Sequence, residues 1–136
     1  MSTWIIPNRT EEYDTRKGLS VFGDEIEWTK KLATTNIATG DTVYLYETKP
    51  RQELIMEFVV TDDNVTTPHQ THRNDGTIVG GSWFKIKFMQ DIKPIAFETL
   101  LRLGVVNGNI QAARLLKPEQ EDALRRIITT SGNNEA

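Results

Sequence analysis

Alternation of apolar and polar residues, in runs rich in β-branched and aromatic side chains, predicts most of the strands in this chain. In one such run, Val43 and Leu45 face the core, whereas Tyr44 and Tyr46 face the opposite side, either in a pocket or under a helix. The predicted strands cover residues 4–7, 42–47, 54–60 and 83–89.

A turn signal stands directly before the second of these strands. Gly40 accepts a positive φ, and the side chain of Asp41 can bond its own backbone, so this pair predicts a tight turn. The loop that leads into the turn, from Asn36 onward, then lies over one end of the sheet. We expect the functional site at this mouth.

Helix signals flank the strands. Thr10, followed by acidic residues, predicts an N-cap and one or two helical turns that end by Gly18. A helix at 97–103 is closed by Gly104, and Pro118 begins a last helix. The region after the first helix is ambiguous, and we expect only short extended pieces there, at 21–22 and 26–28.

Residues 61–81 form a long polar excursion between two strands. The segment contains Pro68, both histidines of the chain and several glycines, and a short strand at 77–79 interrupts it. Loops of this length in a small domain are usually functional or mobile.

Strands in the middle of the chain, helices near its ends and no βαβ alternation predict an α+β fold. The expected architecture is a small, strongly bent sheet or barrel with helices that cover its ends. A chain of 136 residues fits one domain, which we assign to residues 1–130. Residues 131–136 form a disordered polar tail in this interpretation.

Composition narrows the functional classes. The chain has no cysteine, so disulfides and thiolate chemistry are excluded, and no apolar run approaches the roughly 20 residues of a membrane span. The first residues lack a secretory pattern, so a cytoplasmic location is expected. The formal net charge of −3 does not favour nonspecific binding to phosphates, although local basic clusters exist.

Several short motifs, taken together and in order, resemble the EVE domain of the PUA-like superfamily, which is related to YTH and ASCH domains. The likeness spans nearly the whole chain, and the excursion at 61–81 departs from the family pattern. The motifs are Trp4-Ile5-Ile6-Pro7, Ile26-x-Trp28, Asn36-Ile37-x-x-Gly40-Asp41-x-Val43-Tyr44-x-Tyr46, and Gln111-x-x-Arg114 before Pro118.

The resemblance implies a PUA-like bent β-barrel of about five to six strands, with peripheral helices and a pocket at the barrel mouth. Members of this and the sister groups read nucleic acid, often by taking a modified base into an aromatic pocket. Some relatives of this subtype are fused to nucleases or to restriction-type GTPases and recognise modified cytosine in DNA. The resemblance therefore implies a reader of modified cytosine such as 5-methylcytosine, with DNA favoured over RNA and a nuclease as a conceivable protein partner.

Candidate site residues follow from the chemistry of base recognition, which needs flat rings for stacking and a few polar groups for the base edge. Each candidate also has a purely structural alternative, as a core ring, a turn residue or a solvated charge. Asn8 and Gln111 are further amide candidates. The predicted base pocket consists of Trp28, Asn36, Tyr44, Tyr46 and Trp83, and the predicted phosphate contacts are Lys85, Lys87, Arg114 and Lys117.

Catalysis is not indicated. His69 and His72, with Asp75 nearby, lie in a loop without a convincing third metal ligand, so neither a metal site nor a nuclease site is expected. No cofactor motif is present. We therefore expect a noncatalytic reader; the alternatives are a protein-interaction or regulatory domain on the same barrel and a binder of small molecules or free nucleotides.

Overall fold

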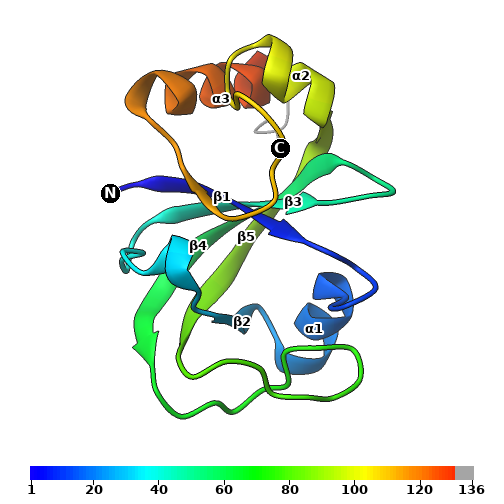
Figure 1. The fold of residues 1–136 in the computed structure, drawn as a ribbon, viewed down its shortest axis with the longest axis vertical. Coiled ribbons are helices and arrows are strands. Elements are labelled where there is room, and N and C mark those ends of the chain that lie inside the picture. Colours follow the sequence, from blue (N-terminus) through cyan, green and yellow to red (C-terminus); the bar gives the residue numbers. More distant parts are fainter. Residues whose placement is uncertain (131–136) are drawn as a thin grey trace.

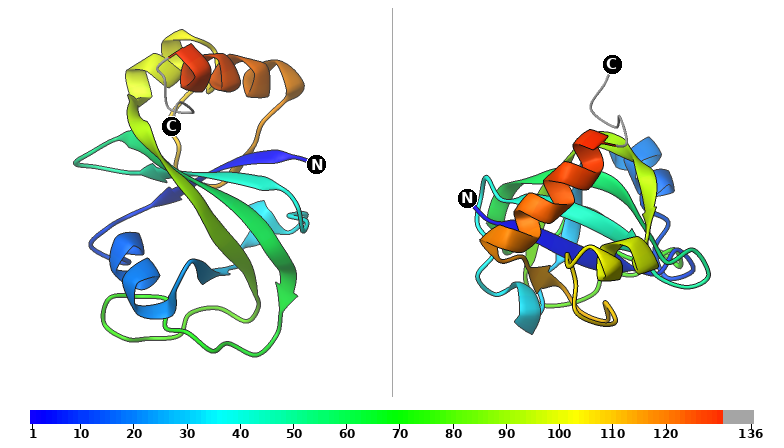
Figure 2. Two further views of the ribbon diagram at one scale, coloured as in Figure 1. Left: turned by 180° about the vertical axis from the view of Figure 1, so that it is seen from behind. Right: turned by 90° about the horizontal axis from the view of Figure 1, so that it is seen from above.

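The computed structural model describes residues 1–130, so the predicted tail at 131–136 lies outside the described residues. Figure 1 shows the strands in the middle of the molecule, with α2 and α3 together at one end and α1 at the other, as the other views confirm (Figure 2). In chain order the elements are β1 (Thr3–Asn8), α1 (Thr15–Phe22), β2 (Glu25–Thr29), the 3₁₀ turn η1 (Leu32–Thr34), β3 (Thr42–Glu47), β4 (Glu53–Val65), β5 (Trp83–Ala96), α2 (Phe97–Arg102), β6 (Arg114–Leu115) and α3 (Pro118–Thr130).

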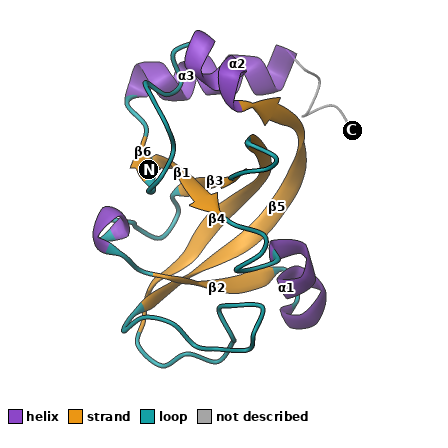
Figure 3. Ribbon diagram, turned by 45° about the vertical axis from the view of Figure 1, so that its right-hand side comes forward, coloured by secondary structure: helices purple, strands orange, loops and turns teal. Residues whose placement is uncertain are grey.

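The strands form one six-stranded sheet in the order β2-β5-β4-β3-β1-β6. The β1–β3 pair is parallel, and the other neighbours are antiparallel. Register shifts interrupt the long β4–β5 pair, and both strands curve strongly (Figure 3). The predicted α+β fold with a strongly bent sheet is confirmed, although hydrogen bonds do not close the described strands into a complete barrel.

The sheet is buried on both faces. One core cluster contains Val43 and Leu45 and packs against residues of α1, whereas a second contains Tyr46 together with buried residues of α2 and α3. Tyr44 packs against the second cluster as well. The predicted alternation along β3 is therefore confirmed, and the two tyrosines face the side that carries α2 and α3.

The turn predicted at Gly40 and Asp41 is present, and it leads directly into β3. Gly40 has φ +96°, a value that residues with side chains rarely adopt. The buried Asp41 carboxylate accepts hydrogen bonds from the backbone N–H of Ser2 at 2.9 Å, from Nε1 of Trp4 at 2.9 Å and from the N–H of Ala38 at 3.0 Å. The Gly-Asp motif thus holds the start of β3 against β1.

The first helix begins later than predicted. Its N-cap is Asp14, whose carboxylate accepts the backbone N–H of Lys17 at 3.2 Å. The Thr10 hydroxyl instead donates to the Glu47 carboxylate, which holds that residue in a loop outside the helix. Residues 21–22, predicted to be extended, are the last two residues of α1.

Three of the predicted strands continue beyond their predicted ends. The predicted strands 54–60 and 83–89 are parts of β4 and β5, and β5 continues through Pro94 at an irregular part of its ladder with β4. The first strand passes through Pro7 to Asn8, since β6 pairs only with the beginning of β1 and leaves that edge open at the proline. The strand predicted at 77–79 is absent, and these residues are loop.

The two C-terminal helices agree with their sequence signals. Phe97 begins α2, and Gly104, which follows the helix, has φ +77°. Pro118 is the first residue of α3, and Leu124 and Ile128 are buried on one face of that helix. Within residues 1–130, no helix is long and apolar enough to cross a membrane.

Candidate functional site

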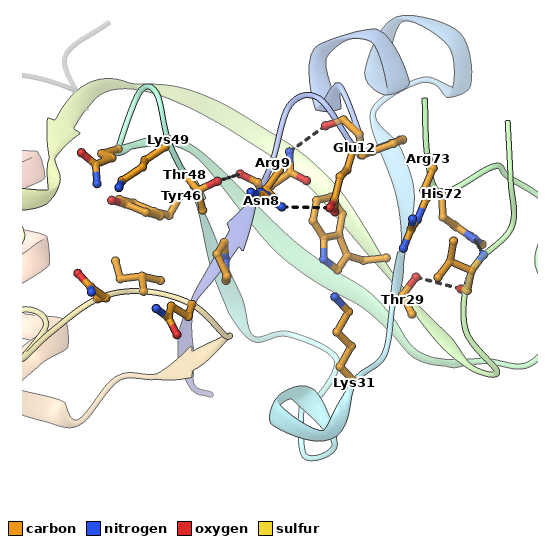
Figure 4. A pocket seen from close by; sticks show the side chains of 18 of the residues that line it. Asn8, Arg9, Glu12, Thr29, Lys31, Tyr46, Thr48, Lys49, His72 and Arg73 are labelled. Carbon is orange, nitrogen blue, oxygen red and sulfur yellow. Dashed lines mark hydrogen bonds and ion pairs between the residues drawn. The ribbon is translucent and has the colours of Figure 1, made fainter. Parts of the chain in front are cut away.

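A cleft of ≈ 630 Å³ opens between the end of β1, the β3–β4 hairpin and the loop of residues 66–82. This volume lies in the range of about 300–1,000 Å³ that ligand pockets usually have. In Figure 4 the side chains of Lys49 and Arg73 lie on opposite sides of the cleft, and Lys31 points into the space between them. The aromatic lining residues are Tyr13, Trp28, Tyr46 and Phe97, and the cationic ones are Arg9, Lys31, Lys49 and Arg73.

The three tryptophans differ in how their indole N–H groups are used. Nε1 of Trp4 donates to Asp41 at 2.9 Å, and Nε1 of Trp83 donates to the carbonyl oxygen of Val79 at 2.7 Å. Trp28 lines the cleft and is half-buried, and its Nε1 finds no acceptor in residues 1–130 and is not sealed from solvent. Trp28 therefore has a hydrogen-bond donor available for a ligand.

Tyr13 supports the Trp28 ring from the side. The two rings meet edge to face, with centroids 5.8 Å apart and planes at 83°. The Tyr13 hydroxyl is buried without a partner among the described residues, and a Cβ at Gly18 would lie 2.1 Å from it. Burial, with smaller contributions from the carboxylates of Asp14 and Glu27, raises the pKa of Tyr13 from 10.0 to about 12. Tyr13 therefore stays neutral at physiological pH and supports Trp28 through its ring.

A buried carboxylate fastens the 66–82 loop to β2. Glu27 accepts hydrogen bonds from the backbone N–H groups of His69 at 2.8 Å and Gln70 at 3.2 Å, and its Oε1 lies 2.9 Å from Nε2 of His72. Nδ1 of His72 accepts the N–H of Val79 at 3.1 Å, so the ring proton is on Nε2 and is donated to Glu27. Both ring nitrogens of His72 are thereby engaged.

A second anchor holds the same loop against the segment before α1. The side chain of Asn74 donates to the carbonyl oxygens of Thr10 at 2.8 Å and Glu11 at 3.1 Å, and it accepts the N–H of Asp14 at 2.7 Å. Arg73 stands between the Asn74 anchor and the histidine anchor and lines the cleft. The excursion therefore forms one wall of the cleft and brings a cation to it.

Asn8 lies at the end of β1, where that strand enters the cleft, and it is buried. Its Nδ2 donates to the carbonyl oxygen of Tyr13 at 2.9 Å, to Oε1 of Glu47 at 3.0 Å and to Oγ1 of Thr15 at 3.3 Å. The strand register also places Asn8 beside Glu47. These bonds fix the orientation of the carboxamide.

Trp28 and Tyr46 are the members of the predicted base pocket that line the cleft. The Tyr46 ring also meets Phe97 at the start of α2, with centroids 6.4 Å apart. Trp83 lies behind the cleft wall, where it is buried and stacks on His72 with ring centroids 5.5 Å apart. The 66–82 loop covers the Trp83 indole, so Trp83 has the structural role that was the alternative to base binding.

The other two predicted base-pocket residues lie away from the cleft lining. Tyr44 faces α3, and its burial and the neighbouring Glu57 carboxylate raise its pKa above the usual range. Asn36 is exposed outside the cleft, because the side chain of the next residue, Ile37, is buried in the core and turns Asn36 outward. Asn8 and Gln111, the further amide candidates, do line the cleft.

The predicted phosphate contacts lie elsewhere on the molecule. The β2–β5 register places Lys85 opposite Glu27 and Lys87 opposite Glu25, an arrangement that balances charge across two strands. Neither lysine lines the cleft. The cations of the cleft come instead from loops and from the β3–β4 hairpin. The alternation of residues along a strand does not reveal the paths of these segments. Lys31 precedes the loop expected over the mouth, and no residue of that loop, 36–41, lines the cleft.

Arg114 and Lys117 have structural environments near the last helix. The Arg114 guanidinium donates to the carbonyl oxygen of Asn109, a residue that lines the cleft beside Gln111. Arg114 therefore supports the cleft wall from outside. Lys117 precedes α3, and its backbone N–H is accepted by the Gln120 side chain at 2.8 Å. Within residues 1–130, no group of three or more histidine or carboxylate side chains has an arrangement that could hold a metal ion.

No protein-family model matches this chain, and no curated protein sequence matches it significantly. Solved structures do match. Rpa0253 from Rhodopseudomonas palustris aligns with a TM-score of 0.71 at 11% identity, over 100% of this chain and 99% of that one. An ASCH protein from Zymomonas mobilis aligns with a TM-score of 0.62 at 13% identity, over 92% and 94% of the two chains.

The YTH domain-containing protein mmi1, whose structure was determined in complex with RNA, aligns with a TM-score of 0.66 at 9% identity, over 96% of this chain and 83% of that one. At such low identities these matches establish the fold alone. The chain has the PUA-like α+β fold that ASCH and YTH domains share.

Proposed function

We propose that this protein is a noncatalytic nucleic-acid reader, which takes an extruded base into the cleft against Trp28. The observation that carries this proposal is the state of that side chain. Trp28 is half-buried in a cationic cleft, and its N–H has no acceptor among residues 1–130, whereas the other two indoles are bonded internally. Base binding uses an aromatic ring on which the base can stack and a hydrogen-bond donor for its edge, and Trp28 offers both.

The energetics of extrusion are compatible with this cleft. Stacking of a base on an aromatic ring contributes about 1–3 kcal/mol, and extruding a base costs a few kcal/mol. Contacts from the flanking phosphates to Arg9, Lys31, Lys49 and Arg73 would supply the remainder. Because the net charge of the protein is −3, we expect such attraction to be confined to this local group of cations.

The carboxylates of the cleft support a binding role rather than a catalytic one. Glu27 is occupied by three donors, and Glu12 lies 3.5 Å from the Arg9 guanidinium. Neither carboxylate is therefore held ready as a general base for a ligand.

The preferred target within this proposal is a modified cytosine in DNA, which follows from the resemblance to EVE domains. Because mmi1 was determined with RNA, matched RNA probes belong in the same experiment. A protein-interaction domain and a free-nucleotide binder are the competing outcomes.

The experiment is a fluorescence titration with short DNA duplexes that contain cytosine, 5-methylcytosine, 5-hydroxymethylcytosine or N6-methyladenine, together with matching single strands of DNA and RNA. Each titration is repeated at low and moderate salt. We expect preference for one modified base and quenching of tryptophan emission. Trp28→Ala should abolish the quenching and weaken binding by about 1–3 kcal/mol.

Matched lysine variants test the cationic rim. Lys49→Gln removes a cleft cation, and Lys17→Gln removes an exposed cation on α1. Lys49→Gln should lower the slope of log affinity against log salt by about 0.7–0.9, and Lys17→Gln should leave it unchanged. No binding of any probe by the folded protein would contradict the reader proposal. Binding of mononucleotides as tightly as oligonucleotides would favour the free-nucleotide alternative.

A further inference from the structure

The carboxamide of Asn8 can adopt only one of its two orientations. Its Nδ2 faces the carbonyl oxygen of Tyr13 at 2.9 Å and the carboxylate of Glu47 at 3.0 Å. A rotated carboxamide would place its own oxygen against these two acceptors, which would repel it. The nitrogen therefore faces the protein interior.

The acceptors that fix Asn8 are themselves held in place. Glu47 is buried, and its second carboxylate oxygen accepts the Thr10 hydroxyl. Asn8 and Glu47 are direct partners in the parallel β1–β3 ladder. The carboxamide is thus fixed from two sides, by Glu47 of the neighbouring strand β3 and by the Tyr13 carbonyl in the segment before α1.

The opposite end of the carboxamide is free. Oδ1 of Asn8 accepts no hydrogen bond from residues 1–130, and it is not sealed from solvent, although the residue is 7% exposed. Asn8 lines the cleft that also contains Trp28. Oδ1 therefore presents a fixed acceptor, and a fixed acceptor requires an N–H or O–H donor on the ligand.

We infer that Asn8 is a specificity-determining residue, which selects bases that carry an exocyclic amino group. The inference rests on the proposed reader function and deepens it. An amino group projects beyond the ring and can reach a recessed acceptor. The imino N–H of uracil or thymine is flanked by two carbonyl oxygens, so when that N–H approaches Oδ1 of Asn8 a ring carbonyl oxygen would lie beside Oδ1, and two acceptors would face each other.

The test compares pairs of single-stranded DNA probes that differ at one base and carry the same number of phosphates. The pairs are cytosine with uracil and adenine with hypoxanthine, and N4,N4-dimethylcytosine serves as a cytosine without any N–H donor. We expect the amino base to bind about tenfold more tightly in each pair, and the dimethylated base to bind as weakly as uracil. These comparisons use the wild-type protein and need no variant to fold.

Three asparagine variants assign the discrimination to a residue. Asn8→Ala should reduce the cytosine-to-uracil affinity ratio to about one, with circular dichroism as the check on folding. Asn64→Ala, at an exposed position on β4, should retain the full ratio. A fall of the ratio in Asn36→Ala with none in Asn8→Ala would assign the reading to the loop and overturn the inference.

The possible failures are distinguishable. Equal affinity for both members of each pair, with quenching of Trp28 retained, would overturn the role of Asn8 and leave the reader function in place. Absence of binding to every probe would overturn both.

Discussion

Two buried carboxylates of this protein have the same chemistry and different tasks. Asp41 and Glu27 are 3% and 2% exposed, and each accepts three hydrogen bonds from N–H groups. The donors to Asp41 are Ser2 directly before β1, Trp4 within β1 and Ala38 in the turn before β3. The donors to Glu27 are His69, Gln70 and His72, which all belong to the 66–82 loop.

The difference lies in what each carboxylate connects. Asp41 joins two strands inside the sheet and lies away from the cleft lining, so its bonds contribute to the global fold. Glu27 lies on the edge strand β2 and lines the cleft, so its bonds hold a loop that shapes the site. Loops of this kind open locally at a lower free energy than the global unfolding of the sheet. The comparison predicts separate consequences for the two carboxylates.

The largest effect is expected for Asp41→Ala. This substitution leaves three N–H groups without their acceptor in the interior, and we expect the free energy of unfolding to fall by about 3–5 kcal/mol. Urea denaturation measures the change. Asp63→Ala is the control, because Asp63 also accepts N–H and O–H bonds, from Thr39, but at an exposed site. A similar small loss in both variants would contradict a global role for Asp41.

Glu27→Gln should have a smaller global effect and a larger local one. A carboxamide keeps one acceptor oxygen. Its NH₂ group would face either the N–H of His69 or the N–H groups of Gln70 and His72. We expect the free energy of unfolding to fall by about 1–2 kcal/mol. Hydrogen exchange should accelerate at the amides of His69 and Gln70, and the amide of Ala38, which bonds to Asp41, should stay protected. Equal acceleration at both sites would mean that the loop and the sheet open together.

Asn74→Ala loosens the other end of the same loop. The lost bonds to Thr10, Glu11 and Asp14 are exposed, so we expect a loss of only about 0.5–1.5 kcal/mol. Affinity for a nucleic-acid probe should fall by more than the stability change alone explains, because Arg73 loses one of its two flanking anchors. Limited proteolysis between residues 66 and 82 and the titration described above measure the two effects.

These two regions were not equally accessible from the sequence. The Gly40-Asp41 turn follows from local chemistry, because a residue that tolerates positive φ and a short carboxylate identify a turn without knowledge of the fold. Trp28, which lines the cleft, stands in a motif before the predicted mouth. The partners of Glu27 lie more than 40 positions away, in a segment where apolar and polar residues do not alternate regularly. No local sequence pattern therefore predicts these contacts.

The same limit explains the cations and the amide. Strand alternation predicts on which face of the sheet Lys85 lies. It does not predict that Glu27 lies opposite Lys85, because the β2–β5 register decides that pairing. Arg73 enters the cleft only because the residues on both sides of it are anchored. Asn8 and Asn36 have the same side chain, and the difference between them is set by burial and by long-range partners such as Glu47. Tertiary register decided these assignments.

The smallest effect on stability at neutral pH is expected for Tyr13→Phe. Tyr13 packs against Trp28 and its pKa is raised in part by Glu27, so this variant tests whether the loop anchor and the aromatic wall of the cleft are coupled. The Tyr13 hydroxyl has no partner in residues 1–130, so its removal should leave the free energy of unfolding unchanged or raise it by up to about 1 kcal/mol. The pH dependence should change more clearly. Burial raises the pKa of Tyr13 to about 12, so the unfolded chain loses this proton near pH 10 while the folded chain keeps it.

Wild-type stability should therefore fall as the pH rises from about 10 to about 12, and the fall should be shallower in Tyr13→Phe. The other tyrosines are common to both proteins and cancel in the comparison. The difference between the ultraviolet titrations of the wild type and Tyr13→Phe isolates the tyrosinate of Tyr13 and gives its pKa. Because Glu27 contributes to the raised pKa of Tyr13, this pKa should be lower in Glu27→Gln and unchanged in Asp63→Ala. If the Tyr13 pKa were the same in Glu27→Gln as in the wild type, the carboxylate that anchors the loop would have no electrostatic effect on the aromatic wall of the cleft. The loop anchor and the aromatic wall would then be independent parts of the site.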